Sequence, residues 1–224
     1  MARPPAARVV AAASGQAGEG AQRRSRAAVG FETLAGCKKN ARRRRARILF
    51  QDESGVSQRP SVRRTWAPKG ETPVLVHAFN WKRMSIAAAL AFSWDGKRSR
   101  LFFQTKPDSY NTGSLIGFLK ALKREFRGSN CILIWDGLPS HKSKVMKAYL
   151  ATQRSWLRVE MLPGYSPHLN PVETLWGNGK GQELANLCPD DLGEGADALR
   201  RGMERVGASR ELARAFLEHA GLSF

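Results

Sequence analysis

The sequence predicts an α/β domain in which a mixed β-sheet is flanked by helices. Residues 132–135 form a continuous apolar run bounded by Gly137 and Pro139, which is typical of a strand covered on both faces. Apolar residues also recur at helical spacing between residues 115 and 126, and this pattern ends at Gly128. Strand and helix signals then alternate along the second half of the chain, which favours helices packed against a shared sheet.

The first expected strand covers residues 48–50 and ends at two acids, Asp52 and Glu53. Two further strands, at about 83–93 and 99–104, flank Asp95-Gly96, a strong signal for a two-residue hairpin. The remaining expected elements are an amphipathic helix over residues 115–126, a strand at 131–135, a helix at 142–153, a strand at 157–161 and a helix that begins after Asn170. Three strands followed by alternating helices and strands predict the mixed sheet.

Residues 59–76, with the sequence RPSVRRTWAPKGETPVLV, separate the first two strands. Pro60 and Pro73 bound this segment and PKG is a turn signal, so we expect a hairpin-like extension. Basic residues flank Trp66 in this segment and Trp81 just after it. Basic and aromatic residues are mixed in this way where proteins bind DNA backbone and unstacked bases. Solvated charge around core tryptophans is the alternative. The candidate DNA contacts are Arg63, Arg64, Lys69, Lys82 and Arg83.

The charge of the chain predicts a polyanionic partner, with nucleic acid as the leading candidate. The 224 residues include 37 Lys and Arg against 19 Asp and Glu, a net charge of +18. Residues 1–47 hold 12 of the basic residues and two acidic ones, which leaves +8 for the rest. Residues 1–46 therefore read as a basic, disordered arm, and residues 47–224 as one folded domain.

The three cysteines, Cys37, Cys131 and Cys188, are isolated and show no CxxC spacing. This pattern suggests neither a disulfide framework nor a structural zinc site, and it is typical of a protein in a reducing cytosol. No stretch approaches the roughly 20 apolar residues of a membrane span. We therefore expect a cytoplasmic protein with no membrane partner.

Three acids stand where strands end or a helix begins. Asp52 and Asp136 each follow an apolar strand, and Glu173 is the third residue of the helix that Asn170 and Pro171 open. A capping box is the alternative role for Glu173. If the acids converge on one edge of the sheet, their repulsion would raise their pKa values, and a pair of divalent cations would relieve it. Two magnesium ions so held can clamp an in-line displacement at phosphorus.

The motifs FQDESG, RRTWAPKG, WDGLPSHKS and LPGYSPHLNPVETLWGNGKG occur in this order. In this arrangement the chain resembles the catalytic domain of bacterial insertion-sequence transposases of the mariner superfamily, from about Arg47 to the last residue. The resemblance implies a DDE-type, RNase H-like fold. It also places Asp52, Asp136 and Glu173 on the three catalytic, metal-binding acids of the family. Glu53 should point to the opposite face of its strand and be structural.

The resemblance further implies an enzyme that uses two magnesium ions, which manganese could replace. Such an enzyme cleaves DNA at the terminal repeats of the element and joins the ends to target DNA at a TA dinucleotide. It would act as a homodimer, associated with the bacterial nucleoid. His141 and Lys142 follow Asp136 closely and could meet a DNA phosphate, although a surface hydrogen bond is as good an interpretation.

Two departures from the family pattern leave alternatives open. Residues 1–46 show no helix-turn-helix pattern for reading element ends, and the helix after Glu173 contains Gly177, Gly179 and Gly181. Each glycine costs a helix about 0.5–1 kcal/mol relative to alanine. A truncated, inactive remnant that only binds DNA is therefore one alternative, and an RNase H-like nuclease is another.

Overall fold

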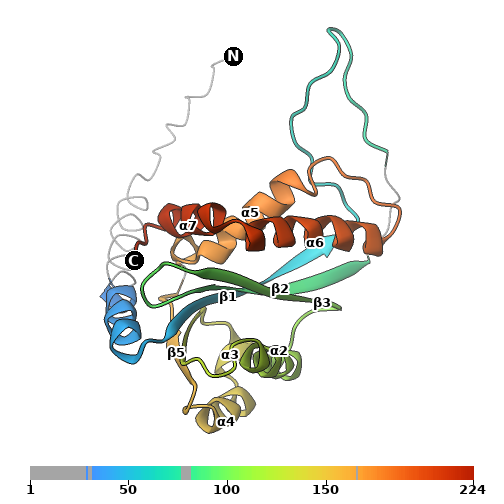
Figure 1. Ribbon diagram of the computed structural model, residues 1–224. Helices are drawn as coiled ribbons and strands as arrows, with labels where there is room; N and C mark the ends of the chain where they lie inside the picture. The colour runs from blue at the N-terminus through green and yellow to red at the C-terminus, as the bar shows by residue number, and fades with distance from the viewer. Residues whose placement is uncertain (1–28, 30–31, 77–81, 165) are drawn as a thin grey trace, which may run out of the picture.

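A five-stranded mixed sheet forms the centre of the computed structural model, which describes residues 29, 32–76, 82–164 and 166–224 (Figure 1). The strands lie in the order β3-β2-β1-β4-β5. Pairing is antiparallel across β1–β2 and β2–β3, and parallel across β1–β4 and β4–β5, so the predicted mixed sheet is confirmed. The strands are β1 Arg47–Ser57, β2 Arg83–Phe92, β3 Ser99–Pro107, β4 Cys131–Trp135 and β5 Leu157–Met161.

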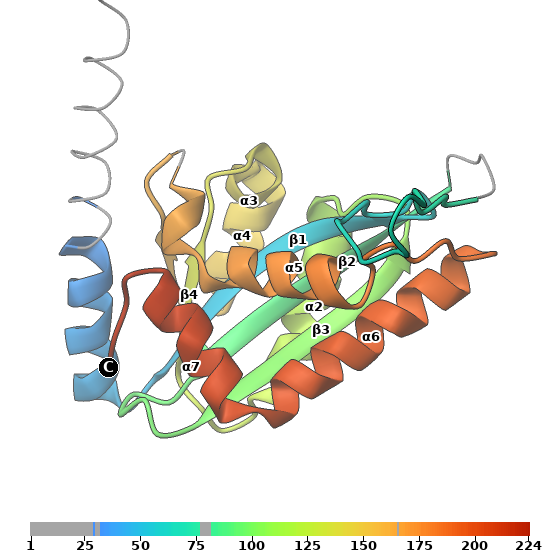
Figure 2. The same cartoon turned by 90° about the horizontal axis from the view of Figure 1, so that it is seen from above.

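Helices cover both faces of the sheet, which gives three layers (Figures 1 and 2). One face carries α5 Pro171–Gln182, α6 Leu192–Ala208 and α7 Arg210–His219. The other carries α2 Thr112–Glu125, α3 Pro139–Lys142 and α4 Lys144–Thr152. A short 3-10 turn, η1 Pro167–Leu169, precedes α5.

Alternation along the strands decides which layer each side chain meets. In β1, Ile48 and Phe50 are buried in the cluster that includes Leu175 and Trp176 of α5. Leu49 is buried in the other cluster, with Leu115 and Phe118 of α2 among its members. By the same parity Asp52 belongs to the α5 face, and Glu53 to the α2 face.

Residues 32–44 are helical, which differs from the disordered arm expected there. Leu34, Cys37 and Ala41 recur every three or four residues and are buried in the same cluster as β1 and α5. The arginine run hid this narrow apolar stripe from the sequence prediction. The folded body therefore begins before residue 47, and the rest of the predicted arm lies outside the described residues.

The strand β1 does not end at Asp52, as the sequence suggested, but continues to Ser57. Pairing with β4 stops at Phe50, whereas antiparallel pairing with β2 continues to Ser57. The predicted helix at 142–153 is likewise divided, because Ser143 ends α3 and caps α4 by accepting a hydrogen bond from the Met146 N–H. The expected two-residue hairpin is a longer loop closed between Ser93 and Arg98.

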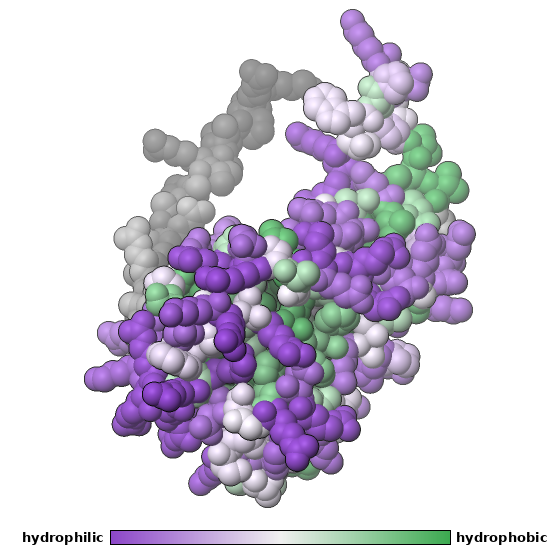
Figure 3. Space-filling model, in the orientation of Figure 1, coloured by the Kyte–Doolittle hydropathy of each residue, from purple (hydrophilic) through white to green (hydrophobic). Residues whose placement is uncertain are grey.

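The expected extension at residues 59–76 projects away from the helical layer of α5 and α6 (Figure 1). Its described part contains no strand, and its one backbone bridge joins Ser61 to Ala185. Four apolar side chains on it are strongly exposed: Val62, Trp66, Val74 and Val76. Figure 3 shows apolar surface on this extension beside an otherwise mostly hydrophilic face.

Candidate active site

Asp52 and Asp136 lie at the same level along the neighbouring strands β1 and β4. The last parallel pair between β1 and β4 is Phe50 with Ile134, and each aspartate stands two residues beyond it. Because β4 ends at Trp135 while β1 continues, the two carboxylates lie where the neighbouring strands part. The register thus brings together two of the three predicted acids.

Glu173 reaches the same place because Asn170 fastens the start of α5 to β1. The Asn170 Oδ1 accepts from the Val172 N–H at 3.2 Å, which caps the helix. Its Nδ2 donates to the backbone carbonyl of Gln51 at 3.3 Å, next to Asp52. Pro171 occupies the first helical position, as expected, and Glu173 lies in the first turn.

A cavity of about 410 Å³ joins the three acids, so the expected convergence of Asp52, Asp136 and Glu173 is found. Lys142 and Ser166 line the same cavity. Across residues 29, 32–76, 82–164 and 166–224, no three His, Cys, Asp or Glu side chains are already grouped as metal ligands would be. The acids therefore share a cavity without meeting at one point.

The electrostatics of the cavity suit a cation. Burial raises the pKa of Asp52 to about 7. The hydrogen bond from Trp176 lowers this pKa, and the charge of Glu173 raises it further. Burial also raises the pKa of Glu173, opposed by Lys180 and aided by Asp136. The buried Ser166 hydroxyl has no hydrogen-bond partner in the described part of the chain. Oxygen donors whose charges are costly without a counter-ion fit magnesium or manganese.

Each aspartate is held by a buried ring nitrogen that sequence reasoning missed. Trp176 Nε1 donates to Asp52 Oδ2 at 2.9 Å, and His141 Nδ1 lies 2.5 Å from Asp136 Oδ1. Burial lowers the pKa of His141, but the carboxylates of Asp136 and Glu53 outweigh it and raise this pKa to about 9. Trp176 lies one helical turn after Glu173. This spacing, which can be read from the sequence, places both side chains on the same face of the helix.

The candidate DNA contacts fall into separate groups. His141 is 1% exposed, so the structure does not support the surface or phosphate contact predicted for it. Lys142 lines the acid cavity, where its Nζ occupies the space that a side chain on Gly137 would need. Arg63, Arg64 and Lys69 are exposed on the extension, and Lys82 and Arg83 line a different groove beside Glu53. Trp81 lies outside the described residues.

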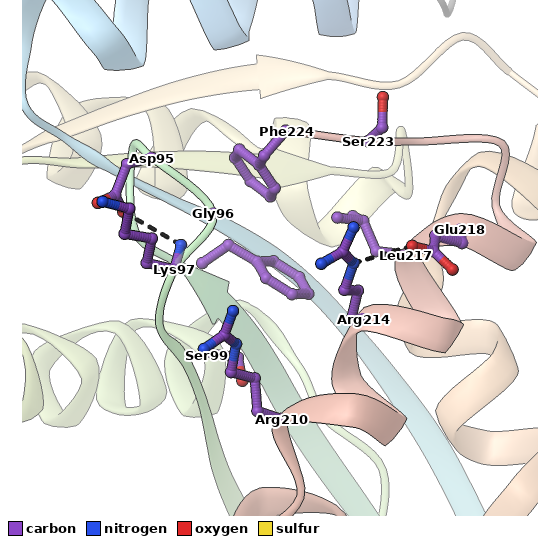
Figure 4. Close-up of a pocket in the computed structure, with 11 residues that line it drawn as sticks. Asp95, Gly96, Lys97, Ser99, Arg210, Arg214, Leu217, Glu218, Ser223 and Phe224 are labelled. Carbon is purple, nitrogen blue, oxygen red and sulfur yellow. Dashed lines mark hydrogen bonds and ion pairs between the residues drawn. The ribbon is translucent and has the colours of Figure 1, made fainter.

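A second cavity, of about 170 Å³, lies between the β2–β3 loop, α7 and the last residues (Figure 4). Its two acids are already engaged. Asp95 accepts from the Ser93 hydroxyl and the Lys97 N–H, and Glu218 pairs with Arg214 at 2.9 Å. These acids are therefore poorer candidates for catalysis than the three in the first cavity.

The family profile described as DDE superfamily endonuclease matches residues 47–192, the segment that contributes all three acids. The chain belongs to this family. The match contains the whole sheet and ends at the start of α6, so all three acids of the cavity lie within it.

A relative of the DDE domain is the insertion element IS630 uncharacterized 39 kDa protein of Shigella sonnei, 30% identical over 130 residues. The match covers 58% of this chain but 36% of that protein, so the chain spans about a third of its curated relative.

Solved structures share the fold. The Mos1 strand transfer complex aligns with a TM-score of 0.53 at 19% identity, over 89% of this chain and 61% of that one. The Mos1 mariner paired end complex with Mn aligns with a TM-score of 0.54 at 19% identity, over 100% and 68%. The sheet flanked by helices is thus an RNase H-like arrangement of the DDE type. None of the described helices combines the length and apolarity needed to cross a membrane.

Proposed function

We propose that this chain is the catalytic domain of a DNA transposase, which cleaves DNA at element ends and transfers the freed strands into target DNA. The observation that carries the proposal is the convergence of Asp52, Asp136 and Glu173, from three different elements, on one cavity. The curated relative comes from an insertion element, and the structural neighbours are complexes of a transposase.

We further infer that the three acids hold divalent metal ions, two magnesium ions with manganese as a substitute. The oxygen-only donor set and the raised pKa values of Asp52 and Glu173 support this. Mos1 has been seen in paired end complexes with Mn and with Mg. When bound, such ions would supply charge stabilisation for both the attacking and the leaving oxygen at phosphorus.

The residues of the chain itself provide binding and orientation. Lys142 places an ammonium group at the cavity, where it would attract the phosphate next to the scissile bond. Arg63, Arg64, Lys69, Lys82 and Arg83 would hold the flanking backbone, since phosphate contacts position DNA without reading its sequence. Trp176 and His141 keep the two aspartates in place.

The partners are the terminal repeats of the element and a target DNA, proposed to be cut at TA, and the active form is proposed to be a homodimer. The exposed Trp66, Val62, Val74 and Val76 of the extension support the dimer, because a projecting apolar surface is costly in water and favours burial against another chain. An enzyme that acts on the bacterial chromosome would work in the cytoplasm, at the nucleoid.

An inactive remnant that binds DNA remains the second candidate, favoured by two glycines of α5. A Cβ at position 179 would crowd Leu199 and Met203, so packing against α6 accounts for glycine at this position. Gly177 has nothing within 4 Å of an added Cβ, and Gly181 has only an ordinary contact with Arg63. Packing therefore does not require glycine at these two positions.

Single substitutions test the enzyme. Asp52→Asn, Asp136→Asn and Glu173→Gln keep side-chain size and remove the charge, so nicking and joining of a terminal-repeat duplex in magnesium should vanish. Asp197→Asn, in an exposed pair with Arg200, is the matched control and should retain full activity. Full activity in Asp136→Asn would refute the site. Calorimetry with no carboxylate-dependent magnesium binding would favour the remnant, and preferred cleavage of RNA–DNA hybrid would favour the nuclease.

A further inference from the structure

His141 is a buried polar ring placed between two carboxylates. Its side chain is 0% exposed, and it belongs to α3, which covers the sheet face opposite α5 (Figure 1). Its Nδ1 lies 2.5 Å from Oδ1 of Asp136, and its Nε2 lies 3.4 Å from Oε1 of Glu53. The second distance is an ion-pair contact without hydrogen-bond geometry. The imidazole thus links the aspartate at the end of β4 to an acid of β1.

The ring has little freedom to turn away. Trp135 stacks on it with ring centroids 3.8 Å apart and an angle of 22° between the planes. The His141 backbone N–H donates to the carbonyl of Leu138 at 3.0 Å, which fixes the start of the short helix α3. On the far side, Gln51 Nε2 donates to Glu53 Oε1 at 2.7 Å and holds that carboxylate. A continuous polar path therefore runs from Gln51 to Asp136.

This path leaves the two oxygens of Asp136 unequal. Oδ1 receives His141 Nδ1 and also the Leu138 N–H at 3.3 Å. For Oδ2, the described residues offer no hydrogen bond or ion pair, although Asp136 lines the acid cavity and is 37% exposed. One oxygen is fixed by the protein, and the other is available to a ligand in the cavity.

Burying this ring is unfavourable unless it does something that an apolar side chain cannot. Its ring stacks on Trp135, and a phenylalanine could make that contact without desolvating an imidazole and a carboxylate. Groups that hold a metal-binding carboxylate from behind, in contrast, improve metal affinity by fixing its orientation.

We infer that His141 is a positioning residue, which uses Nδ1 to hold Asp136 with its second oxygen turned to the metal and which is itself held by Glu53. The inference rests on the proposed function, because it assumes that Asp136 is a metal ligand. It also gives a role to Glu53, which follows Asp52 but points to the opposite face of the sheet. There Glu53 supports Asp136 through His141.

Two isosteric substitutions test the role of the individual nitrogen. In His141→Asn the amide nitrogen sits as many bonds from Cα as Nδ1 and can keep the bond to Asp136. In His141→Gln it sits where Nε2 was and cannot. Titration of the DNA-free chain with Mn²⁺ should give His141→Asn an affinity within about threefold of the parent, and His141→Gln a loss of about 10–100-fold. Glu53→Gln should give a smaller loss than His141→Gln.

Asp136→Asn separates this inference from the function on which it rests. Unchanged Mn²⁺ affinity in Asp136→Asn would refute the metal site itself. A loss there, with equal affinities for His141→Asn and His141→Gln, would overturn the role of Nδ1 alone. Thermal unfolding without metal identifies variants that fail to fold. If the His141 variants fail to fold, Glu53→Gln replaces them in the test, because the Glu53 side chain is partly exposed. An unchanged Mn²⁺ affinity in Glu53→Gln would show that Glu53 does not support Asp136 through His141.

Discussion

Trp176 of α5 donates its indole N–H to Oδ2 of Asp52 in β1, at 2.9 Å. The donor is buried, at 4% exposure, and comes from the same helix as Glu173. One helix therefore supplies both the third acid and the group that orients the first. Any shift of α5 along β1 would disturb two members of the site at once.

Trp176→Phe should keep the aromatic packing and remove this donor. We expect metal-dependent DNA cleavage to fall by about 10–100-fold, and the free energy of unfolding to fall by about 1–3 kcal/mol because a hydrogen bond to a carboxylate is removed. Trp156→Phe is the matched control, because Trp156 Nε1 donates to Gln153 rather than to a cavity residue. Cleavage by Trp156→Phe should equal that of the parent. An equal loss in both variants would contradict a specific role for Trp176.

The sequence predicted the elements that carry simple apolar patterns and missed those in which charge dominates. The bounds of β4 and β5 match the prediction, because both are short runs flanked by turn residues. The helix at 32–44 was missed, since its buried Leu34, Cys37 and Ala41 are spread among lysines and arginines. The length of β1 was missed for a similar reason: its second half is polar, and only pairing with β2 keeps it extended.

The same contrast holds in the candidate site. The shared cavity of the three acids was predictable, since Asp52 follows the apolar half of β1, Asp136 follows β4 and Glu173 lies in the first turn of α5. The buried position of His141 was not, because a histidine between a serine and a lysine reads as surface. Its burial depends on the ring of Trp135 and on Glu53, which is distant in sequence.

The glycines of α5 should respond differently to alanine. Gly177→Ala and Gly181→Ala should each raise the free energy of unfolding by about 0.5–1 kcal/mol, because alanine restricts the unfolded chain and fits the helix where space is open. In Gly179→Ala the new Cβ would lie 2.9 Å from Leu199 Cδ1, and overpacking of about 1–3 kcal/mol should outweigh the gain. Urea unfolding measures all three. Equal effects at the three positions would contradict this packing.

Two buried thiols should make the fold sensitive to alkali. Burial raises the pKa of both Cys37 and Cys131 from 9.0 to about 12. Between these values the unfolded thiols have ionised while the folded ones have not, so the unfolded state binds fewer protons and stability falls as pH rises from about 9 to 12. Urea unfolding from pH 8 to 11 should show this fall, and it should be shallower in the Cys37→Ala, Cys131→Ala double variant. Parallel curves for the two proteins would rule the thiols out.

The basic residues of the extension should hold DNA through phosphate alone. Replacing Arg63, Arg64 and Lys69 by alanine should weaken binding equally on unrelated duplexes, and flatten the slope of log affinity against log salt by about 0.9 for each phosphate that the variant no longer neutralises. Fluorescence anisotropy at several salt concentrations measures both. The charge-matched control replaces Lys147, Arg154 and Arg158, which line a groove beside β5. An equal change of slope in the control would mean that net charge, and not the extension, governs binding.

Asn170 has two separable roles, as the cap of α5 and as its tie to β1. Asn170→Ala should remove both, with a decrease in stability of about 1 kcal/mol or more and a loss of DNA cleavage, because the position of Glu173 depends on the tie. Asn170→Ser keeps a capping oxygen for the Val172 N–H, but it is too short to reach the carbonyl of Gln51 and has no amide to donate. Most of the stability should therefore return in the serine variant while cleavage stays low. Thermal unfolding and a cleavage assay on the same preparations separate the two roles. Recovery of cleavage together with stability would mean that capping alone places Glu173 beside the two aspartates.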